Sequence, residues 1–254
     1  ANDLNNKTFE SIGARPKKFY LPGITPNDVI FDTTDLSEYI GKNNYYKEKD
    51  LHKIVAFASN YLLGAYSKTI NHSKSKKSRH MKWSHPDMVA VSFPHLQWKK
   101  SIQKLSDSIK TSTVELYSIE IKLELNFSNI RECFFQAVSN SSWAHKGYLA
   151  AVNIENGLEF SDELDRLSSA FGIGIIELGT YDYPFCEILN ESRLKPDLDW
   201  TTMDILAKQN PDFNEFVERI GKDINAAEIR SEYYDTPISN EDLEPFFHKI
   251  WFKE

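Results

Sequence analysis

The chain has 254 residues, of which 41% are hydrophobic and 26% are charged, so it is long enough to bury a substantial core. It has no apolar run of about 18 residues, which a membrane span needs, and its first twenty residues lack the apolar segment of a signal peptide. Its two cysteines, Cys133 and Cys186, are far apart, which argues against a disulfide framework or a thiolate metal site. We therefore expect a cytoplasmic globular protein without membrane contact.

The net charge of -7 is unevenly distributed along the chain. Residues 66–110 contain ten lysines and arginines and two acids, which is a local charge of +8. Residues 155–254 contain nine basic and 23 acidic residues, which is a local charge of -14. Phosphate binding depends on the local potential, so an acidic protein can still present a basic face to a nucleic acid.

The first part of the chain is predicted to be irregular and then helical. Residues 1–47 are rich in Asn, Pro, Gly and Thr, which predicts an irregular lead-in, and the abrupt start leads us to expect a further domain upstream. From residue 48 to residue 70, apolar positions recur every three or four residues, which predicts an amphipathic helix. Residues 68–82 then carry six basic residues and no acid, as in a solvated loop or a phosphate-contacting loop.

The middle of the chain alternates between predicted strands and helices. Residues 88–93 form a short apolar run that predicts a buried strand, and residues 95–112 are polar and predict an excursion or a short helix. Residues 114–125 alternate between apolar and charged side chains, which predicts a second strand. The next predicted elements are a helix over 128–142, a strand over 148–154, a helix from 161 to 171 and a strand over 173–178.

This order of elements predicts an α/β fold with a mixed central sheet flanked by helices. Residues 181–199 are predicted to be a connection. Helices are predicted over 201–208 and 210–220, the second ending at Gly221, and a third over 241–252. We therefore divide the chain into a lead-in (1–47), an α/β core (48–180) and a helical C-terminal extension packed on that core (181–254).

The candidate catalytic residues lie on the second predicted strand and at the start of the first. Glu120 and Lys122 are two residues apart on a strand and so share a face, and Asp87 opens the preceding strand. If the two strands pair, two carboxylates converge beside an ammonium group. Their mutual repulsion would be relieved by a divalent cation, and oxygen ligands favour Mg²⁺ or Mn²⁺. Glu-x-Lys alone is most often the solvent face of an edge strand, so the prediction depends on its combination with Asp87.

The sequence Pro86-Asp87 followed by Glu120-Ile121-Lys122, with a helix and a strand after it, resembles the PD-(D/E)xK superfamily of nucleases. The resemblance covers about residues 48–178 and implies a restriction-endonuclease-like core. Within it, the stretches HPDMVAV, YSIEIKLEL and FGIGIIEL look like the bacterial HrgA-type proteins encoded near restriction-modification genes.

The resemblance also implies roles for particular residues. Asp87 and Glu120 would be metal ligands with the backbone carbonyl of Ile121 as a third, Lys122 would be the catalytic lysine, and Gln136 would lie near the active site. Two features of the family are not matched. The tyrosine that some branches carry four residues after the glutamine is Asn140 here, and the first helix has acids, Glu48 and Asp50, only at its start.

Basic and histidine side chains supply the remaining candidates. The predicted phosphate contacts are Lys68, Lys74, Lys76, Lys77, Arg79 and Lys82, joined by Lys99, Lys100 and Lys104. The histidines of this region, at positions 72, 80 and 85, lack a partner cysteine and a regular metal spacing, so a zinc site is not favoured. We expect His85 to be a hydrogen-bonding neighbour of Asp87 or a DNA contact.

The functional expectation is a metal-dependent endonuclease that hydrolyses DNA in a restriction or phage-defence system, with Mg²⁺ or Mn²⁺ as cofactor. Two alternatives remain open. The fold could serve as a DNA- or protein-binding module without hydrolysis, or the same chemistry could belong to an RNA-cleaving toxin. Cleavage of both DNA strands would favour a homodimer with two sites, and a partner from the defence system is a further expectation.

Overall fold

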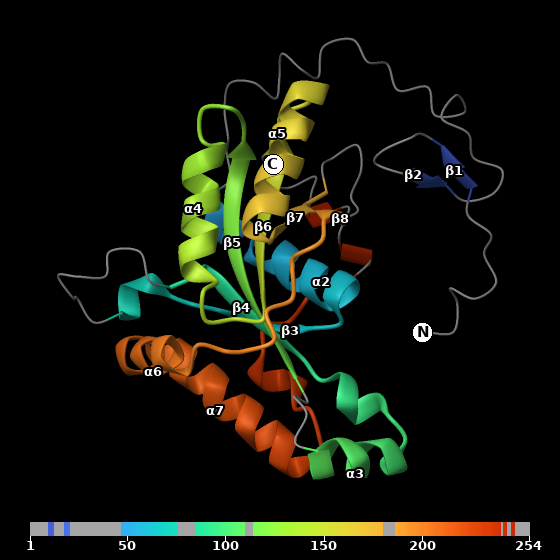
Figure 1. Ribbon diagram of the computed structural model, residues 1–254, viewed down its shortest axis with the longest axis vertical. Coiled ribbons are helices and arrows are strands. Elements are labelled where there is room, and N and C mark those ends of the chain that lie inside the picture. The colour runs from blue at the N-terminus through green and yellow to red at the C-terminus, as the bar shows by residue number, and fades with distance from the viewer. Residues whose placement is uncertain are drawn as a thin grey trace. The chain divides into compact units, whose positions relative to one another are not determined.

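The computed structural model describes residues 10–12, 18–20, 47–75, 85–109, 114–179 and 186–239, together with residues 241, 242, 245 and 246. The chain divides into two compact units, Ala1–Asn44 and Tyr45–Glu254. In the first unit, strands β1 (Glu10–Ile12) and β2 (Lys18–Tyr20) pair antiparallel. The other elements belong to the second unit (Figure 1).

The second unit is built on a mixed six-stranded sheet with the strand order β3-β4-β5-β6-β7-β8 (Figure 1). Its strands are β3 (Tyr66–Thr69), β4 (Met88–Ser92), β5 (Glu115–Leu125), β6 (Lys146–Ile154), β7 (Ile173–Glu177) and β8 (Glu187–Asn190). Strands β5, β6 and β7 run parallel, and the other neighbouring pairs are antiparallel. The predicted α/β fold with a mixed central sheet is thus confirmed.

Six α-helices and four short 3-10 helices complete the described part of the second unit. The α-helices are α2 (His52–Leu63), α3 (Lys100–Ile109), α4 (Ile130–Asn140), α5 (Leu158–Phe171), α6 (Trp200–Gln209) and α7 (Pro211–Ala226). The 3-10 helices are η2 (Glu48–Asp50), η3 (His72–Lys74), η4 (Pro94–Gln97) and η5 (Ser231–Tyr233). None of the helices within the described ranges is long and apolar enough to cross a lipid bilayer.

The helices cover both faces of the sheet. Helix α2 packs on one face against Ile119, Ile121 and Ala150, which alternate with residues of the opposite face. On that opposite face, α4 and α5 cover the β6 and β7 strands, and α6 and α7 form a further apolar cluster with Val89 and Val91 of β4. The buried core therefore continues from the parallel strands to the two C-terminal helices.

Two predicted helix ends differ from the structure. The helix predicted over 48–70 ends at Leu63, because Gly64 adopts the left-handed conformation (φ 58°) and the chain then forms β3. The helix predicted to end at Gly221 continues through it to Ala226, where Ala227 becomes left-handed. The predicted helix over 241–252 falls mostly outside the described residues.

Strand β8 was predicted to be part of a connection. It has only four residues, all of them half-buried, and its two apolar residues are adjacent rather than alternating. Its pairing with β7 is interrupted by a register shift between Ile175 and Ile176. A short, irregular edge strand of this kind lacks the period-two pattern on which a strand prediction depends.

Asn210 joins the start of α7 to the loop that follows β3. Its Oδ1 accepts hydrogen bonds from the backbone N–H groups of Asp212 (2.8 Å) and Phe213 (3.3 Å), which makes it the N-cap of α7. Its Nδ2 donates to the carbonyl oxygen of Asn71 (3.0 Å) and to Ser75 Oγ (2.9 Å). Asp212 adds bonds from the Asn71 N–H (3.0 Å) and from Lys74 Nζ (2.7 Å).

We predict that Asn210→Ala lowers the free energy of unfolding by about 2 kcal/mol, because it removes the N-cap of α7 and the two hydrogen bonds that Asn210 Nδ2 donates to the loop over 71–75. Urea unfolding followed by circular dichroism measures this change. Asn214→Ala is the matched control, since the side chain of Asn214 on the same helix donates to the exposed Glu218 side chain, and it should shift the free energy by less than about 0.5 kcal/mol. Equal losses in both variants would contradict the anchoring role of Asn210.

Candidate active site

The candidate site lies where β4 stops pairing with β5. The two strands pair from Ser92 with Glu115 to Met88 with Ile119. Strand β5 continues to Leu125, paired only with β6 on its other side. From Glu120 onward, the edge of β5 that faced β4 is therefore no longer paired with β4. Asp87, the residue immediately before β4, lies where this pairing ends.

Asp87 remains attached to β5 through its side chain. Its Oδ2 accepts a hydrogen bond from the backbone N–H of Ile121 (2.8 Å), so the carboxylate takes the place of a strand partner. His72 Nε2 in η3 lies 3.3 Å from the other oxygen, Oδ1. The backbone carbonyl of Asp87 also accepts from the N–H of Ile70, which follows β3. Asp87 is thus held between the ends of β3 and β5.

Glu120 is buried, with 1% of its surface exposed. Its Oε1 lies 3.0 Å from Lys122 Nζ, and its Oε2 accepts a hydrogen bond from Asn140 Nδ2 on α4 (2.8 Å). A solvent-facing edge strand would leave this carboxylate in water, as it does for the exposed Glu124. The structure therefore brings Asp87, Glu120 and Lys122 together in a cluster of charges in which Glu120 is buried and the other two are half-buried.

Burial and neighbouring charges set the protonation of this cluster. Burial and the charge of Asp87 raise the pKa of Glu120 to about 7. For Asp87, burial opposes ionisation, but the bonds from His72 and the Ile121 N–H and the charge of Lys122 outweigh it, so its pKa is lowered. Burial likewise opposes the charge of Lys122, yet contact with Glu120 keeps its pKa above the ordinary value. Glu120 is thus the carboxylate that changes its charge near neutral pH.

Glu48 lies near the same cluster. In the sequence it stands at the start of the first predicted helix, whereas some branches of the family have a glutamate in the middle of that helix. The helix begins only at His52, and Glu48 lies in η2, which contacts β5. Burial raises the pKa of Glu48, and its carboxylate interacts electrostatically with Lys122 and Asp87. Glu48 itself is solvent-exposed, so η2 adds an exposed acid beside the released edge of β5 rather than a further buried carboxylate.

His72 and Asn140 are the other site residues that the sequence did not assign. The hydrogen bond that His72 donates to the Asp87 carboxylate raises the pKa of His72, which favours its cationic form. Asn140 stands where some branches of the superfamily have a tyrosine, and its bond to Glu120 gives this position a contact in the site. His85 is buried and packs edge-on against His72, with ring centroids 6.4 Å apart.

The remaining predicted residues are less closely placed. Gln136 is half-buried on α4, one turn before Asn140. Lys68 is half-buried in β3, and Lys74 forms an ion pair with Asp212 (2.7 Å), so it already has an acidic partner. Four further predicted phosphate contacts, Lys76, Lys77, Arg79 and Lys82, lie outside the described residues.

The donor set of the site fits a hard divalent cation that keeps much of its water. Across the described ranges, no group of three or more His, Cys, Asp or Glu side chains is arranged to hold a metal ion. An ion would thus depend on the two carboxylates of Asp87 and Glu120, on backbone oxygen and on water, as Mg²⁺ does in many proteins. In an extended strand, the N–H and C=O of one residue point to the same side, so the Ile121 carbonyl faces the side of Asp87.

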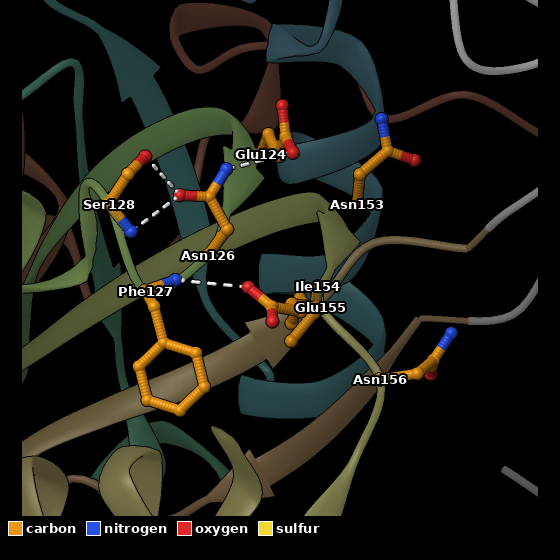
Figure 2. A pocket seen from close by; sticks show the side chains of 8 residues that line it. All are labelled: Glu124, Asn126, Phe127, Ser128, Asn153, Ile154, Glu155 and Asn156. Atoms are coloured by element: carbon orange, nitrogen blue, oxygen red, sulfur yellow. Dashed lines mark hydrogen bonds between the residues drawn. The ribbon is translucent and has the colours of Figure 1, made fainter. Parts of the chain in front are cut away.

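A separate hollow lies at the carboxyl ends of β5 and β6 (Figure 2). It is lined by Glu124, Asn126, Phe127, Ser128, Asn153, Ile154, Glu155 and Asn156. Hydrogen bonds within the lining, from the Phe127 N–H to Glu155 Oε2 (3.0 Å) and from the Ser128 N–H to Asn126 Oδ1 (2.9 Å), stabilise the turn before α4 (Figure 2). The hollow includes none of Asp87, Glu120 and Lys122, so we do not place the chemistry there.

Comparison with known proteins does not assign a family or a function to this site. No family model, no curated protein and no solved structure matches the chain. The findings thus define a mixed six-stranded sheet with flanking helices and a partly buried cluster of charges where β4 leaves β5.

Proposed function

We propose that this protein is a metal-dependent endonuclease that hydrolyses the phosphodiester bonds of DNA, within a restriction or phage-defence system. One observation carries the proposal. Asp87 immediately precedes β4, Glu120 lies on the neighbouring strand β5, and the ammonium group of Lys122 lies 3.0 Å from Glu120 at the point where these strands part. Residue types, chain order and strand positions all agree with the PD-(D/E)xK pattern that the sequence resembles.

Each residue of the cluster has a role in this proposal. Asp87 and Glu120 hold Mg²⁺ or Mn²⁺, with the Ile121 carbonyl as a third oxygen. When bound, such an ion polarises a phosphoryl oxygen and lowers the pKa of water. Lys122 orients the attacking water or stabilises negative charge on the phosphoryl group. Asn140 and His72 fix the orientations of the two carboxylates through their hydrogen bond and ion pair.

The charge distribution supports a nucleic acid as substrate. The segment 66–110, with its charge of +8, contains both β4 and the Asp87 side of the site. Among the described residues of this segment, Lys99, Lys100 and Lys104 are exposed. Contacts from lysines to phosphates give affinity without sequence preference.

The saturated hydrogen bonding of the carboxylates favours one alternative, a binding module without hydrolysis. Each of the four carboxylate oxygens of Asp87 and Glu120 already has a protein donor or cation beside it, namely His72, the Ile121 N–H, Lys122 and Asn140. A charge cluster satisfied in this way can be a structural feature of the fold. A module of this kind would bind DNA or a protein partner without any dependence on a divalent ion.

Replacing the central residues should abolish cleavage. We expect Asp87→Asn, Glu120→Gln and Lys122→Ala each to reduce Mg²⁺- or Mn²⁺-dependent DNA cleavage at least 100-fold, because each removes a group that binds the ion or stabilises developing charge. The assay uses methylated and unmethylated duplexes beside single-stranded DNA and RNA.

Glu124→Gln is the matched control for these variants, since Glu124 lies on the same strand but is exposed, and it should retain activity. A wild-type protein that is inert with both metals and all nucleic acids would overturn the proposed reaction. Cleavage of RNA alone would instead identify an RNA-cleaving toxin.

The affinity for Mn²⁺ should depend on pH. With a folded-state pKa of about 7, Glu120 is protonated below neutrality, and the ion must then displace that proton. We expect the association constant to fall about tenfold per pH unit below 7 and to level off above it, with more protons released on binding at pH 6 than at pH 8. Titration calorimetry in buffers of different ionisation enthalpy measures both quantities.

Two variants make the calorimetric result decisive. Glu124→Gln should leave the pH profile unchanged, whereas Asp87→Asn should eliminate most of the binding. Mn²⁺ binding that is absent, or that survives Asp87→Asn, would favour the binding module and count against the nuclease.

A further inference from the structure

A hydrogen-bond relay links the C-terminal segment to the first helix through the end of β3. Thr69 Oγ1 lies 2.7 Å from Asp235 Oδ2 and 2.9 Å from Nδ1 of His52, the first residue of α2. The backbone N–H of Thr69 donates to the same oxygen of Asp235 (2.6 Å). Three segments that are far apart in the sequence therefore meet at one hydroxyl group.

The direction of the bonds in this relay fixes the tautomer of His52. A carboxylate oxygen only accepts and a hydroxyl group has one hydrogen, so Thr69 donates to Asp235 and its oxygen accepts from the ring of His52. The Nδ1 of that ring must then carry the hydrogen. When the ring is neutral, its Nε2 keeps a lone pair, and the described residues offer this nitrogen no hydrogen-bond partner.

Burial keeps the ring of His52 neutral. It lowers the pKa of His52, so the uncharged form is favoured at neutral pH. The charge of His72 acts in the same direction. The negative charges of Asp87, Asp235 and Asp50 act in the opposite direction and are outweighed by burial. The same three carboxylates stabilise an imidazolium once the ring takes up a proton, so His52 is a base whose protonated form is supported.

The relay lies beside the candidate site. Thr69 pairs with Met88, which directly follows Asp87. The next residue of the chain, Ile70, donates its N–H to the carbonyl oxygen of Asp87 (2.9 Å). The charge of Asp87 also acts on the ring of His52. A neutral base with a free nitrogen is therefore held next to one of the two carboxylates of the site.

The proposed hydrolysis needs a proton acceptor that the other site residues do not supply. The attacking water must lose a proton, and a positioned side chain that takes it up accelerates the reaction. Contact with a carboxylate raises the pKa of Lys122 and that of His72, which favours their protonated forms. Asp87 and Glu120 hold the ion in the proposed reaction, so their oxygens are already engaged.

We propose that His52 is the catalytic residue that accepts this proton, with Thr69 and Asp235 as the residues that position its ring; the inference rests on the proposed function. Water gives one proton to His52 Nε2 while its oxygen forms a bond to phosphorus. The bond between phosphorus and the leaving oxygen breaks, and this oxygen keeps the electron pair and takes a proton from solvent water. The imidazolium then releases its proton to solvent.

NMR spectroscopy tests the relay without any activity. In the metal-free full chain at pH 7, the imidazole nitrogen resonances of His52, assigned by their loss in His52→Asn, should show the Nδ1–H tautomer. Thr69→Ser keeps the hydroxyl group and should keep this tautomer. Thr69→Val keeps the shape of the side chain but removes the hydroxyl group, so the preference should be lost. A wild-type ring that is cationic or carries its hydrogen on Nε2 would overturn the inference.

His52→Asn tests the catalytic role. The asparagine amide can replace Nδ1 as the donor to Thr69, but nothing replaces Nε2. We expect kcat at saturating Mn²⁺ to fall about 100-fold or more, with KM changed less than about threefold. The wild-type kcat should fall about tenfold per pH unit below the pKa of His52 and level off above it, and the variant should lose this dependence. Lys53→Gln, at the exposed neighbouring position of α2, is the control and should behave like the wild type.

The results separate this inference from the proposed function. An active wild type whose His52→Asn variant keeps its kcat and its pH profile would overturn the role of His52 and leave the nuclease standing. Loss of the pH dependence in Glu48→Gln instead would make that exposed acid the acceptor. A wild type that is inert with both metals would overturn the proposed function and the catalytic role together, and the NMR spectra would still show whether the relay exists.

Discussion

The hydrogen bond from the Ile121 N–H to the Asp87 carboxylate is the contact on which the site depends. At this position β5 has lost its partner on the β4 side, and an unpaired backbone N–H inside a protein is costly. The Asp87 side chain satisfies that donor and, in doing so, keeps a second carboxylate next to Glu120. The point where the two strands separate thus holds the carboxylates of Asp87 and Glu120 in fixed positions.

The positive and negative charges around this contact do not fully cancel. Lys122 and the cationic form of His72 face the carboxylates of Asp87 and Glu120, and Glu48 adds a third acid to the same field. Glu120 is the least stabilised anion of the set, since burial and Asp87 both oppose its charge. Above neutral pH the cluster therefore holds more negative than positive charge, which is the condition under which a divalent cation gains most from binding.

The C-terminal helices take part in this arrangement rather than only adding acidic surface. Asn210 and Asp212 at the start of α7 bind the loop over 71–75, and this loop carries His72 to Asp87. Asp235 accepts from both the N–H and the hydroxyl group of Thr69, at the end of β3. Acids from the segment with the largest negative charge thus hold the described residues 69–75, which follow from the end of β3.

The contrast between what the sequence predicted and what it missed follows from the range of the interactions. Alternation along 114–125 and the glycine after α5 are local signals, and the strand and the helix end that they predicted are present. His72 has no such signal, because its position depends on a contact between Asn71 and Asp212, 141 residues apart. The burial of Glu120 likewise depends on Asn140, which α4 brings back over the strand. Glu-x-Lys on an exposed edge and Glu-x-Lys in a charge cluster have the same local pattern, so only the tertiary contacts distinguish them.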